Sequence, residues 1–132
     1  MAQSMNSTVD FTIKATSFSG LATYGDIMVG NKAFEFYNER NPEDYIQIPW
    51  EEVDSIAAEV IGKRIVRFAI IIKQGQHFGF STRDNKATLR AVSAYIDESR
   101  MFRSISFLDV VKSGFRSLGS IIMSPFRKGD ES

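Results

Sequence analysis

The sequence predicts a mainly β protein of the α+β class: a bent antiparallel sheet of about seven strands, capped by a helix and followed by an additional C-terminal amphipathic helix. Three observations support this prediction. Apolar and polar residues alternate with a period of two over the first eighty residues. Turn sequences rich in Gly, Asn and Pro interrupt the alternation. Beyond that point, apolar residues recur at helical spacing instead.

The first half of the chain contains four expected strands, at residues 9–15, 24–29, 32–37 and 44–50. In the first of them, Val9, Phe11, Ile13 and Ala15 share one face. Gly30-Asn31 is a pair that can adopt the positive φ angles of a tight hairpin turn. Pro49 has no amide hydrogen to donate, so the fourth strand is expected at a sheet edge or a bulge.

Three more strands are expected at residues 53–61, 64–72 and 76–80. The segment 53–61 is ambiguous between helix and strand, and the hairpin signal Gly62-Lys63 favours a strand. The segment 64–72 is apolar on both faces apart from Arg67, which indicates a strand that is covered on both sides or lies in an interface. Trp50 shares a face with isoleucines, so a place in the core is favoured over the wall of a ligand pocket.

The pattern changes to helical spacing after residue 80. Ser81 begins the sequence STRD, a capping box with Asp84 three residues on. Leu89, Val92 and Ile96 then fall on one face of a helix. Seven antiparallel strands followed by one helix is the order of a pleckstrin-homology (PH)-like barrel, and a β-sandwich with an appended helix is the alternative.

Residues 107–122 form a second predicted helix. Its apolar residues fall within an arc of about 160° of the helical wheel, and polar residues fill the opposite side. Pro125 ends the helix, and Gly114 and Gly119 weaken it in isolation, so it needs a surface to fold against. We therefore assign residues 1–98 to a PH-like domain and residues 99–132 to a helical extension and tail of the same single domain.

The residue types that carry catalysis are sparse. The chain has no cysteine, which removes thiolate chemistry and Cys-ligated zinc, and its single histidine, His77, is expected on the outward face of a strand. The carboxylates match no calcium-loop spacing, and the glycines form no phosphate-binding loop. The sequence therefore predicts a protein that is not an enzyme and that uses no metal or cofactor.

The sequence also favours a cytoplasmic location. The N-terminus lacks the basic and apolar regions of a signal peptide, and no apolar stretch is long enough to span a bilayer. Sixteen basic and sixteen acidic residues give a net charge of zero, which makes nucleic acid an unlikely partner. No pair of helices suggests a helix-turn-helix either.

Several phrases resemble the ManO-type family, a group of small domain-of-unknown-function proteins encoded beside the mannose-family phosphotransferase permease in Gram-positive bacteria. The phrases run in order from the first third of the chain to residue 104: YGDIMVGNKAFEFYN (24–38), DYIQIPWEEVD (44–54), RFAI (67–70), DNKATLRA (84–91) and RMFRS (100–104). The resemblance covers nearly the whole chain, from about Met1 to Phe126. It implies an accessory or regulatory role in mannose and glucose uptake, and it transfers no catalytic residues.

Three surfaces can receive the helix at 107–122: the chain's own two-sided strand 64–72, a partner protein, or the membrane interface at the inner face of the cell membrane. The partner protein would be a second copy or the membrane subunits of the permease. The candidate partner-binding residues combine the apolar arc with nearby cations: Phe107, Leu108, Val111, Phe115, Leu118, Ile122, Arg100, Arg103, Lys112 and Arg116. The leading hypothesis is an adaptor that binds the permease; the alternatives are a transcriptional regulator of the mannose operon and a PH-like module that binds lipid.

Overall fold

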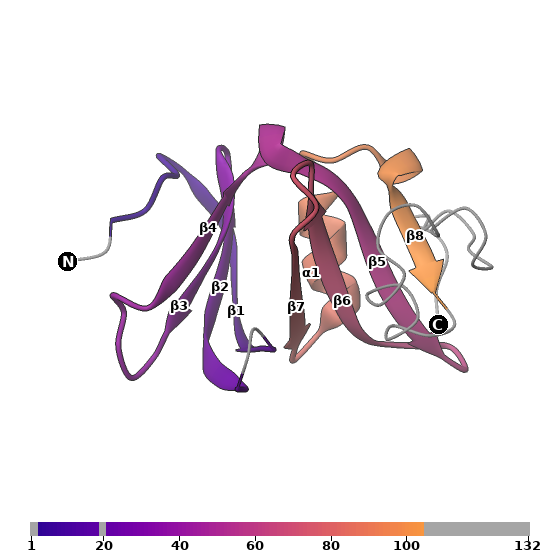
Figure 1. The fold of residues 1–132 in the computed structure, drawn as a ribbon, viewed down its shortest axis with the longest axis horizontal. Helices are drawn as coiled ribbons and strands as arrows, with labels where there is room; N and C mark the ends of the chain where they lie inside the picture. Colours follow the sequence, from indigo (N-terminus) through magenta and orange to yellow (C-terminus); the bar gives the residue numbers. More distant parts are fainter. Residues whose placement is uncertain (1–2, 19–20, 105–132) are drawn as a thin grey trace.

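The computed structural model describes residues 3–18 and 21–104 of the chain. Figure 1 shows how these residues form one bent sheet with a helix packed against it. The elements follow one another in this order: β1 (Val9–Ser17), β2 (Thr23–Gly30), β3 (Ala33–Asn38), β4 (Tyr45–Pro49), the 3₁₀ helix η1 (Trp50–Glu52), β5 (Val53–Ile61), β6 (Arg64–Ile72), β7 (His77–Thr82), α1 (Asn85–Val92), the 3₁₀ helix η2 (Glu98–Arg100) and β8 (Met101–Ser104).

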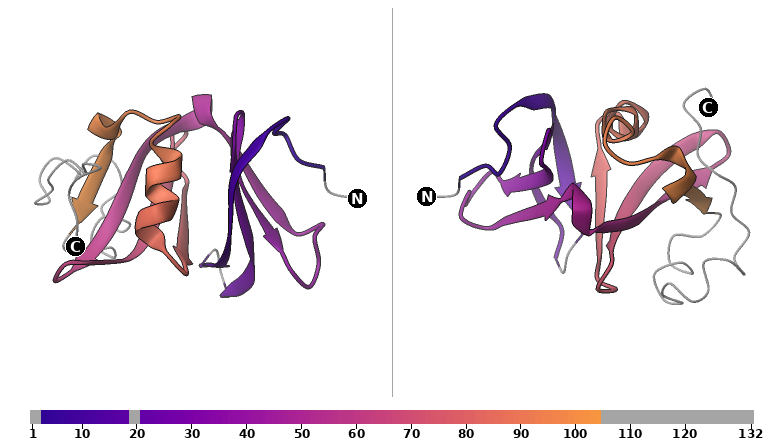
Figure 2. Two further views of the ribbon diagram at one scale, coloured as in Figure 1. Left: turned by 180° about the vertical axis from the view of Figure 1, so that it is seen from behind. Right: turned by 90° about the horizontal axis from the view of Figure 1, so that it is seen from above.

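The strands have the linear order β4-β3-β2-β1-β7-β6-β5-β8. Strands β1 to β4 form one antiparallel meander, and β5 to β7 form a second. The two meanders meet where β1 pairs with β7, a contact of only three residue pairs that joins Ala15–Ser17 to Phe80–Thr82. The sheet bends at this junction, and α1 packs on its inner side (Figure 2). Pro49 lies on the edge strand β4, as the sequence predicts.

The seven strands expected from the sequence all form, including the ambiguous segment 53–61, which is β5. The expectation of a wholly antiparallel sheet of about seven strands is nevertheless wrong, because an eighth strand, β8, pairs in parallel with β5. The crossover through α1 brings the chain back to the open edge of β5, whose backbone groups β8 then satisfies. The boundary expected at residue 98 falls just before this strand.

Two local predictions are corrected. The helix N-cap is Asp84, whose carboxylate accepts a hydrogen bond from the amide of Ala87, so Ser81 does not begin a capping box and lies within β7. Among the described residues, positive φ angles occur only at Gly62 and Gly75, so the Gly30-Asn31 turn does not use the positive φ angles expected of it. Gly62, with φ of 63°, does form the predicted turn between β5 and β6.

The core lies inside the bend, and aromatic rings join its two halves. The ring of Phe34 on β3 lies 6.2 Å from that of Phe68 on β6 and 5.1 Å from that of Phe80 on β7. Trp50 lies in the core as predicted: its indole stacks on Tyr95 at 5.1 Å, and its Nε1 donates a 2.8 Å hydrogen bond to the carbonyl oxygen of Gly30. Ring packing across the inside of the bend therefore joins the two meanders.

Strand β6 is buried on both of its faces. Phe68 and Ile70 belong to the core cluster, whereas Ala69 and Ile71 are buried on the opposite face. The register places Ala69 beside Ala57 of β5 and beside Gly79 of β7, so small side chains line that face. The expectation of a strand covered on both sides is confirmed for residues 68–72.

Gly25 is required by the close approach of β2 to β3. A Cβ atom at this position would lie 2.0 Å from the carbonyl oxygen of Tyr37, a backbone atom that cannot move without disturbing the pairing. We therefore expect Gly25→Ala to lower the free energy of unfolding by about 3 kcal/mol, the upper range of overpacking costs. Urea denaturation followed by tryptophan fluorescence measures the loss.

Gly62→Asn is the matched control for this prediction. No atom lies within 4 Å of a Cβ placed at Gly62, and asparagine tolerates its positive φ angle. Equal stability losses in the two variants would contradict the steric explanation for Gly25.

Candidate functional site

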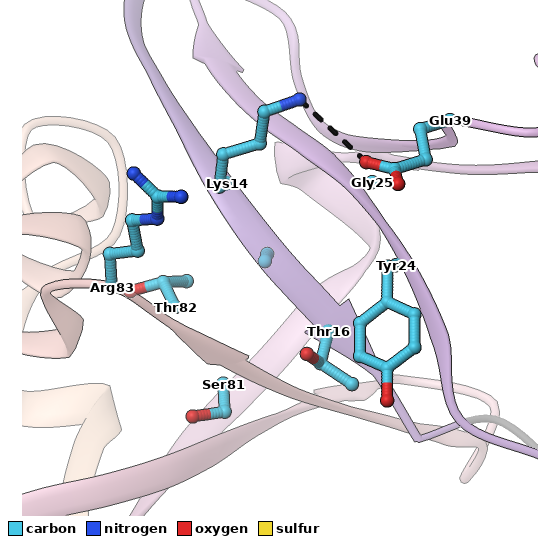
Figure 3. A pocket seen from close by; sticks show the side chains of 9 residues that line it. Lys14, Thr16, Tyr24, Gly25, Glu39, Ser81, Thr82 and Arg83 are labelled. Atoms are coloured by element: carbon cyan, nitrogen blue, oxygen red, sulfur yellow. Dashed lines mark ion pairs between the residues drawn. The ribbon is translucent and has the colours of Figure 1, made fainter.

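An open pocket of about 460 Å³ lies where β1 and β7 diverge beyond their short pairing. Figure 3 shows two cations at its rim, Lys14 on β1 and Arg83 immediately after β7. Thr16 and Tyr24 contribute hydroxyl groups from β1 and β2, and Ser81 contributes one from β7. At this end of the β1–β7 pairing, the amide of Arg83 donates a 3.3 Å hydrogen bond to the carbonyl oxygen of Lys14.

The charges of this pocket suit a small anionic group. The Lys14 ammonium is shared between Asp26 at 3.2 Å and Glu39 at 3.7 Å, so most of its charge is already balanced. Within residues 3–18 and 21–104, the Arg83 guanidinium makes no hydrogen bond or ion pair. Its N–H groups are therefore available to a carboxylate or phosphate oxygen. Glu39 also lines the pocket and offsets Lys14, so Arg83 is the group of this pocket that is suited to contact an anion.

The N-terminal segment forms a second polar arrangement. Residues 3–8 run across the β2–β3 hairpin, and Asn6 fastens them there by hydrogen bonds to the backbone. Its Oδ1 accepts from the amides of Lys32 and Ala33 at 2.8 Å each, and its Nδ2 donates to the carbonyl oxygen of Ala33. Gly30 permits this approach, since a Cβ atom there would lie 2.3 Å from Cγ of Asn6. We call residues 3–8 the N-terminal strap.

Glu35 is the buried anchor of the N-terminal strap. Its side chain is on the outer face of β3, yet the residue is 0% exposed. The carboxylate accepts a 2.6 Å hydrogen bond from the hydroxyl of Ser4, another of 2.6 Å from the amide of Met5, and one of 3.1 Å from Nδ2 of Asn6. Three donors from one segment compensate the burial of this charge, and the burial makes the strap an integral part of the fold.

The network extends from Glu35 to the edge strand β4. Nε2 of Gln47 donates to the carbonyl oxygen of Gln3 at 2.7 Å and to the Tyr37 hydroxyl at 3.0 Å. Burial raises the pKa of Tyr37, and the nearby Glu35 carboxylate raises this pKa further, because both disfavour the phenolate. Tyr37 therefore stays a neutral hydroxyl around neutral pH and can act as a hydrogen-bond donor within the network.

The structure places only two of the residues predicted to bind a partner. The Arg100 guanidinium donates hydrogen bonds to the backbone carbonyl oxygens of Val53 and Asp54, so this side chain fastens η2 to the start of β5. Arg103 lies on β8 and is half-buried. The remaining candidates lie outside the described residues, namely Phe107, Leu108, Val111, Phe115, Leu118, Ile122, Lys112 and Arg116.

The residues predicted from the sequence include neither the pocket beside Arg83 nor the N-terminal strap. The β1–β2 hairpin places Tyr24 beside β1, and the pairing of β1 with β7 brings Arg83, distant in the sequence, to the same place as Lys14. For Glu35 a signal did exist: an acidic residue opposite an aromatic strand face, between Phe34 and Phe36, in a chain whose first residues are polar. Alternation alone predicts that such a residue is solvated, because alternation does not report what covers the outer face.

Two further features concern metals and membranes. Within the ranges that the structure describes, no three His, Asp or Glu side chains gather in an arrangement that could hold a metal ion. The helices of those same ranges fall short of the length and hydropathy that crossing a bilayer requires. His77 is exposed on β7, as expected.

The fold and these two arrangements define a small mixed-sheet domain with an anion-sized pocket and a fastened N-terminal strap. Residues 1–115 match the model of a protein family described as a domain of unknown function (DUF956), and the chain belongs to that family. No curated protein matches the sequence. The fold is similar to the crystal structure of the C-terminal domain of an unknown protein from Leishmania infantum, with a TM-score of 0.60 and 10% identity, over 67% of this chain and 83% of that one.

The N-terminal strap depends on Glu35, and this dependence can be tested. Glu35→Ala leaves three donors without their acceptor, so we expect a loss of about 2–4 kcal/mol in the free energy of unfolding. The amide of Met5, which donates to the carboxylate, should also exchange its hydrogen much faster. Urea denaturation and hydrogen exchange measure the two effects.

Glu39→Ala serves as the control for the loss of a carboxylate. Glu39 is exposed and its ion pair with Lys14 is long, so its removal should cost less than about 0.5 kcal/mol. A Glu35→Ala protein that keeps full stability and slow exchange at Met5 would show that the strap is held by other contacts.

Proposed function

We propose that this protein is a non-enzymatic accessory or regulatory protein of a mannose-type phosphotransferase system. It binds the permease on its cytosolic side and modulates sugar uptake. The observation that carries the proposal is the resemblance to ManO-type proteins, which runs in order through most of the chain. Membership of a family of unknown function is compatible with this role and does not itself assign it.

The phrases that carry the resemblance fall on elements that build the fold. YGDIMVGNKAFEFYN (24–38) forms the β2–β3 hairpin with Glu35, and DYIQIPWEEVD (44–54) forms β4, η1 and the start of β5. RFAI (67–70) is the part of β6 at the centre of the core, and DNKATLRA (84–91) supplies the N-cap and most of α1. The resemblance therefore concerns one folded unit and supports a shared architecture with ManO-type proteins.

We further propose that this architecture is PH-like. Two antiparallel meanders that meet at β1 and β7, with a helix packed inside the bend, support this interpretation. Strand β8, added in parallel to β5, would then be an extension of the PH-like unit. A PH-like architecture agrees with an adaptor by analogy of fold alone, because a fold does not by itself assign a function.

The outer face of the second meander supports contact with a protein helix. Ala57, Ala69 and Gly79 form a row of small residues across β5, β6 and β7, and Phe102 of β8 continues the row at the edge. Small side chains let a helix approach a sheet closely. Because Ala57 and Ala69 are only 1% and 0% exposed, this row is no free surface for the permease, and the predicted helix at 107–122 is the occupant that it fits.

Co-purification tests the proposal. The full chain, carrying an affinity tag, is expected to recover the permease membrane subunits from detergent-solubilised membranes that contain both proteins. Phe115→Asp and Leu118→Asp place a charge in the predicted apolar arc, and each should lower the recovered permease more than about tenfold. Immunoblotting of the eluate measures the recovery.

Ser117→Asp is the matched control, because it introduces the same charge on the polar side of the predicted helix and should leave the recovery unchanged. If the wild-type chain recovers no permease from membranes that hold both proteins, the adaptor function is wrong. Salt-dependent retardation of operator DNA by the purified chain would favour the transcriptional alternative instead.

A further inference from the structure

One end of the molecule collects three hairpin tips and the start of α1. Because the strands of both meanders are antiparallel, the β1–β2, β3–β4 and β5–β6 connections all open toward the same side. The β7–α1 junction lies there too, and Figures 1 and 2 show all four connections at that end. We call it the hairpin end and define it by residues 18, 21–24, 38–45, 61–64 and 82–86.

The hairpin end carries most of the exposed apolar surface. Of the seven large hydrophobic side chains that are exposed among the described residues, five lie here: Phe18, Leu21, Tyr24, Tyr45 and Ile61. Leu21 is 88% exposed and Ile61 is 61% exposed, each at the tip of a hairpin. Side chains this exposed bury little apolar area within the fold, so Leu21 and Ile61 contribute little to its stability.

Cations surround these apolar tips. Lys63 and Arg64 follow Ile61 in the β5–β6 turn and are exposed, and Arg83 is exposed at the end of β7. The guanidinium of Arg67 lies 5.9 Å from the centre of the Phe18 ring, so the end of β1 is held against β6 and its basic neighbours. The combination of exposed apolar residues with Lys and Arg is typical of surfaces that bind at a membrane interface.

The acidic residues of this end lie apart from Ile61. Glu39, Glu43 and Asp44 belong to the β3–β4 connection, which is on the opposite side of the molecule from the β5–β6 hairpin in Figure 1. Asp84 is engaged as the N-cap of α1. Glu39 does reach the start of β2, where its amide donates to the carbonyl oxygen of Tyr24, but its carboxylate is paired with Lys14. Lys63, Arg64 and Arg83 therefore leave an excess of positive charge at the corner formed by the β1–β2 tip, the β5–β6 tip and Arg83.

We propose that this corner of the hairpin end docks on an anionic membrane surface. Leu21 and Ile61 enter the boundary between headgroups and acyl chains, and Lys63, Arg64 and Arg83 contact lipid phosphates. A bilayer suits the geometry better than a protein pocket, since the two apolar tips stand on separate hairpins and a flat surface can receive both at once. The charge of the corner complements anionic lipids.

This inference does not rest on the proposed function, because it requires lipid and no permease. The two are compatible: a protein that docks by this corner is held at the inner face of the membrane, where a permease is accessible. Their tests are separate, since pure vesicles contain no permease.

Co-sedimentation of the full chain with vesicles tests the inference. One set of vesicles is phosphatidylcholine alone, and the other contains phosphatidylcholine and phosphatidylglycerol. We expect at least tenfold preference for the anionic vesicles, with binding that weakens as salt is added. The double variant Leu21→Ser/Ile61→Ser and the charge reversal Lys63→Glu/Arg64→Glu should each reduce binding to anionic vesicles roughly tenfold.

Matched controls come from the opposite end of the sheet. Val9 is 42% exposed at the start of β1, and Lys73 is exposed in the β6–β7 turn. Val9→Ser and Lys73→Glu should bind anionic vesicles like the wild type. All the substituted side chains are exposed, and circular dichroism melting verifies that each variant is folded.

Three results would overturn the inference. The first is equal sedimentation of the wild-type chain with neutral and anionic vesicles. The second is an equal loss of binding in the hairpin-end variants and in the Val9 and Lys73 controls. The third is a loss confined to Arg127→Glu/Lys128→Glu, which would assign lipid binding to the C-terminal tail.

Discussion

The ring of Phe34 connects the two meanders of the sheet. It stands on β3, and its neighbours are Trp50 at the turn into the second meander and the rings of Phe68 and Phe80 within that meander. The strands themselves join the meanders through only three residue pairs between β1 and β7. Aromatic packing therefore adds to this short pairing in holding the two meanders together across the bend, and α1 contacts strands of both.

The two faces of β3 stabilise the fold in different ways. Phe34 and Phe36 face the core, while Glu35 between them faces outward and is covered by the N-terminal strap. Burying a carboxylate lowers the stability of the fold unless hydrogen-bond donors surround it. Ser4, Met5 and Asn6 supply these donors, so the burial of Glu35 depends on them. The chain's first residues thereby become part of the sheet's packing.

The functional proposals use two regions of this one unit, the outer face of the second meander and the hairpin end, where Arg83 belongs to both the pocket and the basic corner. The pocket beside Arg83 suits a small anion, the outer row of Ala57, Ala69 and Gly79 suits a helix, and the hairpin end suits a lipid surface. A protein placed at a membrane beside a permease would use more than one of them. The antiparallel meanders make this possible, because they send the β1–β2, β3–β4 and β5–β6 tips to one end of the molecule, separate from the outer face of the sheet.

The alternation of residues in the sequence by itself determined seven of the strands, the inward face of Trp50, and the change to a helix after residue 80. Period and turn chemistry are local properties, so they can be read without the fold. The tertiary structure alone decided the parallel pairing of β8 with β5, the burial of Glu35 and the meeting of Lys14 with Arg83. Each of these joins segments that are distant in the chain, and a local pattern states which residues share a face without stating what covers that face.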